Sequence, residues 1–234
     1  MENNVFIAVP THNGDIRGEV AASVLQASTQ SKIAYCHQKL SNLTRNFNSL
    51  LCMALNGKIF SHFCMIHGDV ITRDAGWLGK MLAIMQETCA DILSVILPIK
   101  GQKGLTSTGY CKEETVPLTI KRLTMKEVFA LPETFAHEHL VVNTGLMLIN
   151  LQAPFMSHVG RGLCFRVTDQ IVYDKGGKLQ TVGSPEDWLW SLDARGLGAK
   201  IYATRAIKAD HCGGSMMYPN HEPFGVDSED YHLS

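Results

Sequence analysis

The sequence has no excess of charge of either sign and no long apolar run. Its 234 residues include 21 Lys and Arg against 22 Asp and Glu, so the formal net charge is -1. A strongly basic chain would suggest a nucleic-acid partner, and this balance gives no such sign. No stretch approaches the roughly 18 consecutive apolar residues that a membrane-spanning helix needs. We therefore expect a protein without a membrane span.

Paired cysteine motifs are also missing. The seven cysteines are odd in number, form no Cys-x-x-Cys pair and lie mostly inside apolar runs. This pattern is typical of reduced thiols in a cytoplasmic protein, and not of a disulfide framework or a zinc ribbon. With 45% hydrophobic residues, the chain is long enough for one sizeable core. The sequence therefore predicts a soluble, cytoplasmic protein with a single domain.

Basic residues concentrate in one region only. They are Lys100, Lys103, Lys112, Lys121, Arg122 and Lys126. The simplest interpretation is a solvated connecting region, because charged side chains are usually exposed.

Apolar runs alternate with helical patterns through residues 1–97. The runs 5–10, 32–37, 59–66 and 91–99 are apolar along most of their length, as strands buried on both faces are. Helical spacing marks 18–28, 41–55 and 74–89, with Ser41 and Asp74 as candidate N-caps. Short connections between these segments favour a mostly parallel sheet flanked by helices. In such α/β sheets, ligands bind beyond the carboxyl ends of the strands.

The alternation breaks after Pro98. Residues 98–124 are rich in Gly, Thr, Ser and Lys, and we expect an irregular region that can include a hairpin. A strand is predicted at 140–151, a helix at 184–198 and a final pair of strands at 199–211. The polar residues 214–234 predict a mobile C-terminal tail that orders over a bound ligand.

A histidine and an aspartate follow directly after one of the buried strands. His67 and Asp69 are two residues apart, so on an extended chain end they point the same way and can share a cation. Gly68 between them lets a ligand approach the backbone. The alternatives are that Asp69 caps the next turn and that His67 is a surface residue. The pair alone does not decide between them.

Several motifs together resemble a known family. In chain order they are "VPTHN", "TRNFN", "HGD", "PEDWLW", "DARGLGAKIY" and "DHCG". This series is similar to the catalytic domain of GT-A glycosyltransferases, the nucleotide-diphospho-sugar transferases, of a family-2-like kind. The resemblance covers most of residues 5–213. It implies a Rossmann-like GT-A domain over 1–213, with a nucleotide-binding half at 1–97 and an acceptor-side half at 98–213.

The resemblance implies a divalent metal site. Relatives have an acidic motif at a strand end, usually Asp-x-Asp, and a histidine near the end of the domain. Here Asp69 and His211 match, while His67 replaces the first acid of the motif. The expected ligands are therefore Asp69, His211 and His67. Mixed nitrogen and oxygen ligands favour Mn²⁺ over Mg²⁺. The alternative for His211 is a loop histidine bonded to backbone.

The resemblance also implies a nucleotide-sugar donor site. The residues expected there are Pro10, Thr11, Asn13, Arg45, Asn46 and His67. Many relatives have an acid after the second strand that contacts uracil, and this chain has His37 and Gln38 instead. A UDP-sugar is therefore only a weak preference. Arg45 can equally be a solvated helix residue.

Two carboxylates open the helix predicted at 184–198. In inverting relatives, the aspartate of this pair takes the proton from the acceptor hydroxyl, which implies Asp187 as the catalytic base beside Glu186. The alternative is that both acids only complement the helix dipole. Trp188 and Trp190 can stack on an acceptor, although helix aromatics are more often part of the core.

Three functions fit this sequence. The first is a metal-dependent, inverting glycosyltransferase that acts on an unidentified acceptor. The second is a metal-dependent phosphoester hydrolase, with His12, Asp15, His67, Asp69 and His211 as a two-metal set. The third is a non-catalytic module that binds nucleotide sugars. The paired acids at 186 and 187 favour the first, because the second gives them no role.

Overall fold

A seven-stranded sheet forms the centre of the protein. The computed structural model describes residues 3–29, 31–113 and 118–226. The strand order is β2-β1-β3-β10-β5-β13-β8. The strands are β2 (Lys32–Lys39), β1 (Asn4–Thr11), β3 (His62–Ile66), β10 (Leu146–Asn150), β5 (Ile92–Val95), β13 (Ile201–Thr204) and β8 (Thr134–Phe135). Pairing is parallel except where β10 and β8 run against their neighbours. The predicted α/β class, with a mostly parallel sheet flanked by helices, is confirmed.

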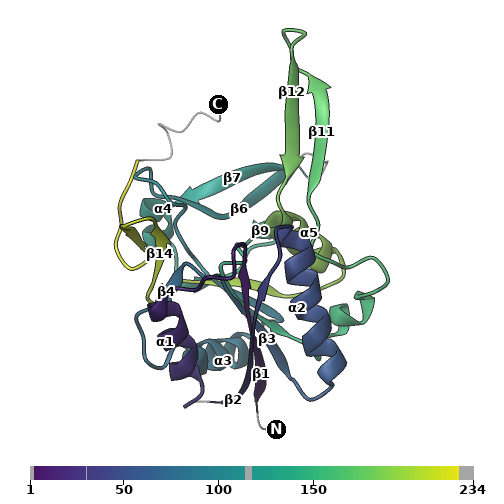
Figure 1. Cartoon of the computed structure of the whole chain (residues 1–234). Coiled ribbons are helices and arrows are strands. Elements are labelled where there is room, and N and C mark those ends of the chain that lie inside the picture. The colour runs from purple at the N-terminus through teal and green to yellow at the C-terminus, as the bar shows by residue number, and fades with distance from the viewer. Residues whose placement is uncertain (1–2, 30, 114–117, 227–234) are drawn as a thin grey trace.

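Helices cover both faces of the central sheet (Figure 1), and each face buries a core of its own. Alternation along β1 directs Phe6 and Ala8 into one core and Ile7 into the other, as strand geometry requires. Helices α2 (Leu43–Gly57) and α5 (Glu186–Gly196) cover the first face, and α1 (Gly18–Ala27) and α3 (Trp77–Thr88) cover the second. This burial on both sides explains why the strands are apolar along most of their length.

Both expected N-caps are wrong. The N-cap of α2 is Asn42, whose side chain accepts a hydrogen bond from the Arg45 backbone, and not Ser41. Helix α3 begins after Gly76 instead of at Asp74. The Asp74 carboxylate pairs with Lys80 and accepts from the Lys208 backbone, so long-range contacts use the side chain that local capping would need.

The strand predicted at 140–151 is two strands in different sheets. β9 (Leu140–Val141) pairs with β6 (Leu105–Glu113), whereas β10 joins the central sheet. Between them, buried Asn143 donates to the Val95 carbonyl and accepts from the Gly145 backbone. The side-chain amide takes the place of strand hydrogen bonds and redirects the chain. This break brings Thr144 beside the carboxyl end of β3.

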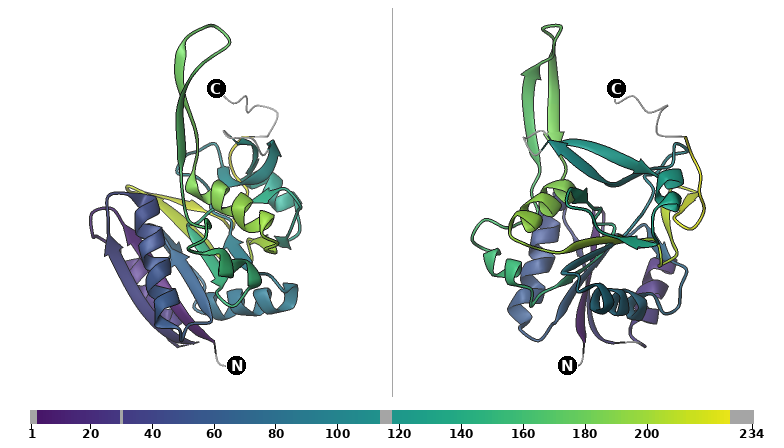
Figure 2. Two further views of the ribbon diagram at one scale, coloured as in Figure 1. Left: turned by 90° about the vertical axis from the view of Figure 1, so that its right-hand side faces the viewer. Right: turned by 180° about the vertical axis from the view of Figure 1, so that it is seen from behind.

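Three small sheets lie around the central one (Figure 2). Two of them are β7-β6-β9, with β7 (Thr119–Thr124), and β15-β14-β4, with β4 (Val70–Thr72), β14 (Ala209–Gly213) and β15 (Met216–Pro219). The third is a hairpin, β11 (Thr168–Tyr173) and β12 (Leu179–Ser184), which projects from the body. The hairpin of β6 and β7 lies in the region predicted as irregular. The short helices are α4 (Met125–Ala130) and η1 (Pro154–His158). Within the described ranges, no helix has the length and apolar character needed to cross a membrane.

The C-terminal segment is more ordered than expected up to residue 226. β15 pairs with β14, and Asn220 is fully buried. Its side-chain amide donates to the carbonyls of Ile96 and Ile207, and its side-chain oxygen accepts from the Ala209 backbone. The mobile tail predicted from residue 214 is therefore wrong for 216–220. Residues 227–234 lie outside the described residues.

We expect Asn220→Ala to destabilise the protein. The change removes three buried hydrogen bonds of 2.9–3.0 Å. Each contributes about 1 kcal/mol, so the free energy of unfolding should fall by about 3 kcal/mol. Urea unfolding measures this, with exposed Glu222→Ala as the control. Equal stability of the two variants would show that the segment is not held by this residue.

Candidate functional site

Two pockets open where the carboxyl ends of the central strands meet. The first, which we call the β1 pocket, has a volume of about 270 Å³ and is lined by Pro10, Thr11, His12, Asn13, Asp15, Leu43, His67, Gly68 and Asp69. The second, the α5 pocket, has a volume of about 380 Å³ and is lined by His67, Leu97, Pro98, Ile99, Ser107, Arg122, Asn143, Thr144, Gly145, Pro185, Glu186, Asp187 and His211. His67 lines both. The two pockets therefore adjoin at the strand end that carries His67 and Asp69.

His67 is held from three sides. Its backbone N–H donates to the Gly145 carbonyl, and its Nε2 lies 3.4 Å from the Thr144 hydroxyl. Phe47 packs against the ring at a centroid distance of 5.3 Å. Burial lowers the pKa of His67 to about 4, although Asp69 opposes the shift. The imidazole is therefore neutral near pH 7 and able to donate or accept a hydrogen bond.

Asp69 makes the charged contacts at the end of β3. One carboxylate oxygen, Oδ2, forms an ion pair with the Lys100 ammonium and lies 3.6 Å from His211 Nε2. The other, Oδ1, is buried and has no hydrogen-bond partner. Burial raises the pKa of Asp69, but the interactions of its carboxylate with His211 and Lys100 outweigh burial and hold the pKa well below its ordinary value. Asp69 is thus a carboxylate with one oxygen unused.

His211 presents a ring nitrogen to Asp69. Its Nδ1 lies 2.8 Å from the Pro98 carbonyl, and a carbonyl can only accept, so Nδ1 carries the proton. In the neutral ring, Nε2 then has a free lone pair directed toward Asp69. Metal-binding histidines usually have such a hydrogen bond from the ring nitrogen that does not bind the metal, and it fixes the tautomer of the ring. The alternative of a loop histidine bonded to backbone describes Nδ1 correctly but leaves Nε2 without a role.

Asp69 and His211 fit a divalent cation that arrives with other ligands. Their donor set is one carboxylate and one imidazole, with the unpartnered Oδ1 as the free acceptor. Hard divalent cations are often held by few protein ligands together with substrate phosphates. In the part of the chain that the structure describes, no three His, Cys, Asp or Glu side chains are arranged to hold a metal. The three-ligand set that includes His67 is therefore not assembled, because Nε2 of His67 faces Thr144.

Asp187 and Glu186 face the α5 pocket from the first turn of α5. Asp187 is only 7% exposed. Burial and the neighbouring Glu186 raise the pKa of Asp187 to about 7, while the Trp188 backbone N–H and Arg122 oppose the shift. Burial also raises the pKa of Glu186. A carboxylate that titrates near pH 7 beside a pocket is suited to accept a proton there.

Lys100 and Arg122 are site residues that sequence reasoning missed. Both belong to the basic region predicted to be solvated, yet Lys100 pairs with Asp69 and Arg122 lines the α5 pocket. The guanidinium of Arg122 lies 4.8 Å from the centre of the Trp188 ring. The only signal in the sequence was that this concentration of charge follows a strand end directly.

The predicted donor-site residues divide into two groups. Pro10, Thr11 and Asn13 line the β1 pocket with His67. Asn46 does not line it: it is 1% exposed, and its amide donates to the carbonyls of Thr11 and Gln38. It joins the ends of β1 and β2 and so positions the pocket wall. Arg45 is exposed and lines neither pocket.

The two tryptophans of α5 belong to the core. Trp188 is 8% exposed and its ring N–H donates to the Ser107 carbonyl. Trp190 is fully buried and stacks on Phe165 at a centroid distance of 4.1 Å. Neither lines the α5 pocket.

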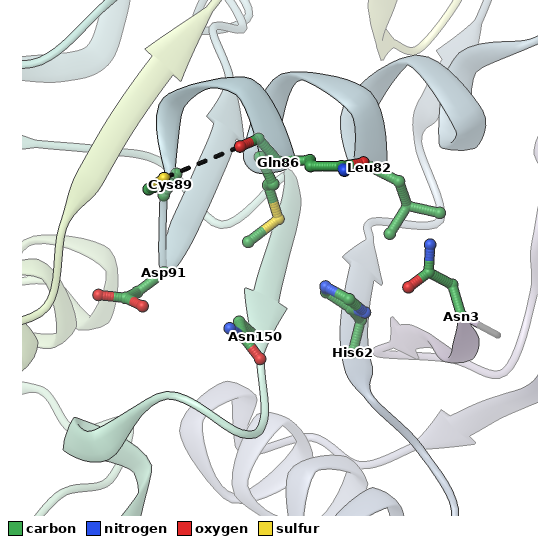
Figure 3. A pocket seen from close by; sticks show the side chains of 9 residues that line it. Asn3, His62, Leu82, Gln86, Cys89, Asp91 and Asn150 are labelled. Atoms are coloured by element: carbon green, nitrogen blue, oxygen red, sulfur yellow. Dashed lines mark hydrogen bonds between the residues drawn. The ribbon is translucent and has the colours of Figure 1, made fainter. Parts of the chain in front are cut away.

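A larger hollow lies at the opposite end of the sheet (Figure 3). It has a volume of about 470 Å³, and Asn3, His62 and Asp91 line it from the amino ends of β1, β3 and β5. The Cys89 thiol at its rim donates to the Gln86 carbonyl, 3.9 Å away. Ligands of open α/β sheets bind at the other edge, so volume alone does not make this hollow the functional site.

Comparison with known proteins supports the fold. No protein-family model matches the chain, and no curated protein matches it by sequence. Among solved structures, A197 from STIV matches with a TM-score of 0.57 and 12% identity, over 98% of this chain and 100% of that one. At this identity the match establishes a shared fold and nothing more.

Two structures of proteins in complex with nucleotide sugars match less closely. Residues 1–349 of TarS from S. aureus, in complex with UDP-GlcNAc, give a TM-score of 0.44 and 11% identity, over 99% of this chain and 62% of that one. UDP-glucose pyrophosphorylase complexed with UDP-glucose gives 0.48 and 9%, over 92% and 94%. These scores are too low to bear on the function of this chain.

Proposed function

We propose that the chain is a metal-dependent glycosyltransferase that moves a sugar from a nucleotide-diphosphate donor to an acceptor hydroxyl, with inversion. One arrangement supports the proposal most strongly. The β1 and α5 pockets adjoin at His67, with Asp69 lining the first and Asp187 lining the second. A transferase needs these two places, one for the donor diphosphate and one for the acceptor hydroxyl, next to each other.

The residues divide the chemistry between them. The nucleoside occupies the β1 pocket against Pro10, Thr11 and Asn13, and the acceptor occupies the α5 pocket. Asp187 takes the proton from the acceptor hydroxyl, whose oxygen forms the bond to the anomeric carbon. The bond from that carbon to the diphosphate breaks, and the diphosphate leaves with the electron pair. Asp69 and His211 would hold the divalent cation, and when bound it would supply positive charge against that of the diphosphate.

Neutral His67 fits this division because it adds no charge at the junction. A protonated histidine would repel a cation on Asp69, and burial keeps this ring unprotonated near pH 7. We assign His67 a hydrogen-bonding role toward the donor.

The phosphoester hydrolase is the less supported alternative. Its set of five residues is divided: His12 and Asp15 line only the β1 pocket, and His211 lines only the α5 pocket. Asp15 is instead paired with Asn13, whose amide donates to it at 2.6 Å. A hydrolase would also leave the buried Asp187 without a task. The non-catalytic binding module predicts donor binding with no turnover.

A donor screen tests the proposed function directly. The protein is incubated with Mn²⁺ and with UDP-, GDP-, CDP-, ADP- or dTDP-sugars. Two quantities are measured, the release of nucleoside diphosphate and the change in melting temperature that each ligand causes. We expect one donor both to stabilise the fold and to be consumed. Release of nucleoside monophosphate and sugar phosphate would indicate a hydrolase. Binding of a donor without release of any product would indicate a non-catalytic module that binds nucleotide sugars.

Arg122→Met should move the pH dependence of the reaction. The guanidinium favours the charged form of Asp187, so its removal raises the pKa of Asp187 above about 7. Because only the carboxylate accepts a proton, the rising limb of kcat/KM against pH should shift upward by up to about one unit. The matched control is Arg161→Met, which removes an exposed guanidinium outside both pockets. If the rising limb did not shift, Arg122 would not influence the protonation of the catalytic base.

A further inference from the structure

A lysine ammonium lies on the carboxylate at the centre of the candidate site. Lys100 pairs with Oδ2 of Asp69, the oxygen that His211 Nε2 also approaches at 3.6 Å. The other oxygen of Asp69 is buried without a partner. The carboxylate therefore already holds one cation, and that cation belongs to the chain.

The path of the lysine side chain is built into the fold. Its stem passes over Gly213, where an added Cβ would lie 3.2 Å from Cδ and 3.3 Å from Cβ of Lys100. Gly213 follows His211 by two residues in β14. A Cβ at 213 would be in tight contact with the lysine stem, which would have to shift to make room. The strand that supplies the histidine thus also leaves room for the lysine.

Two cations cannot share Oδ2 of Asp69 without strong repulsion. The same holds for an ion on the free oxygen, Oδ1, because the two oxygens belong to one carboxylate and an ion there would still lie within a few ångströms of the ammonium. Lys100 has a flexible four-carbon stem and three N–H donors, so it can leave the carboxylate and still reach an anion beside it. A diphosphate bound at Asp69 through a cation would be that anion.

We propose that Lys100 is an internal cation that exchanges partners during donor binding. In the free protein it holds Asp69 and weakens the binding of a divalent metal alone. When the metal enters with a nucleoside diphosphate, the ammonium leaves the carboxylate and pairs with the diphosphate. Metal and nucleotide then bind cooperatively. The inference rests on the proposed nucleotide-diphosphate donor, and it assigns the site a device that prevents metal binding without donor.

Lys100→Met tests the exchange because it should shift two affinities in opposite directions. Mn²⁺ alone, titrated into metal-free protein and followed by electron paramagnetic resonance of the free ion, should bind the variant about tenfold more tightly, since the competing charge is gone. With Mn²⁺ saturating, the tightest binder among UDP, GDP, CDP, ADP and dTDP should bind the variant about tenfold more weakly, since a charged contact is lost.

Lys80→Met is the matched control, because Lys80 also pairs with an aspartate, Asp74, but lies outside both pockets. Unchanged or weaker Mn²⁺ binding in Lys100→Met would overturn the exchange, as would unchanged nucleotide affinity. If Lys100→Met strengthened Mn²⁺ binding and weakened nucleotide binding, but the protein transferred no sugar, the exchange would stand and the proposed function would be rejected. Asp69→Asn in the Lys100→Met background should abolish the gained Mn²⁺ affinity, which locates the ion.

Discussion

Asp187→Asn is expected to lower turnover by about a hundred- to ten-thousandfold, the contribution of a positioned general base. Asparagine keeps the shape of the side chain and an oxygen for the Trp188 backbone N–H, which donates to Asp187 at 2.8 Å. It cannot take a proton from an acceptor hydroxyl. Donor affinity should stay within about twofold, because Asp187 lines the α5 pocket and not the β1 pocket. Single-turnover rates and nucleotide titrations measure both quantities.

The stability of the same variant provides an independent check. The folded pKa of Asp187, about 7, lies above its ordinary value of 3.8, so the folded protein holds a proton that the unfolded chain releases. This contribution to the free energy of unfolding is complete below about pH 4 and is lost as the pH rises through 7. Asparagine does not titrate, so at pH 8 the variant should be at least as stable as the wild type.

A helix-capping role for Asp187 predicts the reverse. Replacement would then lower stability slightly, through the helix dipole, while turnover persisted. Glu186→Gln is the control in the same first turn, and we expect it to change turnover less. Product stereochemistry adds a separate criterion, because retention at the anomeric carbon would remove the need for this base.

Asp69→Ala should have the second largest effect on turnover. The carboxylate interacts with both His211 and Lys100 and has an unpartnered oxygen. Without it we expect a loss of about a hundred- to a thousandfold, the scale of removing one electrostatic contact to a leaving group. Excess chelator should produce a loss of the same order in the wild type. Mn²⁺ should restore activity better than Mg²⁺, because one of the two ligands is an imidazole nitrogen.

The matched control is Asp74→Ala, which also removes an aspartate that pairs with a lysine, at 3.2 Å, but outside both pockets. Mn²⁺ binding by calorimetry should be lost in Asp69→Ala and kept in the control. Full activity of the wild type in chelator would contradict the metal proposal, and it would leave Lys100 as the charge that the diphosphate meets.

The sequence by itself determined the features that depend on local pattern. Runs such as 5–10 and 59–66 are apolar along most of their length because each strand is buried on both faces, and that burial is visible in the composition of the run. Helical spacing located α2 because one side of the helix must be apolar. Start and stop signals in the sequence located α5. The strand end at His67 and Asp69 was predictable for the same reason, since polar residues begin where the buried strand stops.

Local pattern was insufficient where a side chain contacts residues that are distant in the sequence. Asp74 was a good N-cap by sequence, but it binds Lys80 and the Lys208 backbone. Asn46 had the chemistry of a ligand contact, yet it joins the ends of β1 and β2. The run 140–151 looked like one strand, because no local signal shows that Asn143 bonds to Val95 in a neighbouring strand.

Only the tertiary structure decided the chemistry of the site. Asp69, Lys100 and His211 come from separate parts of the chain, and their contacts exist because β14 pairs with β4 directly after Asp69. The raised pKa of Asp187 comes from burial, which depends on everything that packs around α5. Sequence spacing specifies which groups are available, whereas distance and burial set their charges, because electrostatic energies depend on position in space and on access to water.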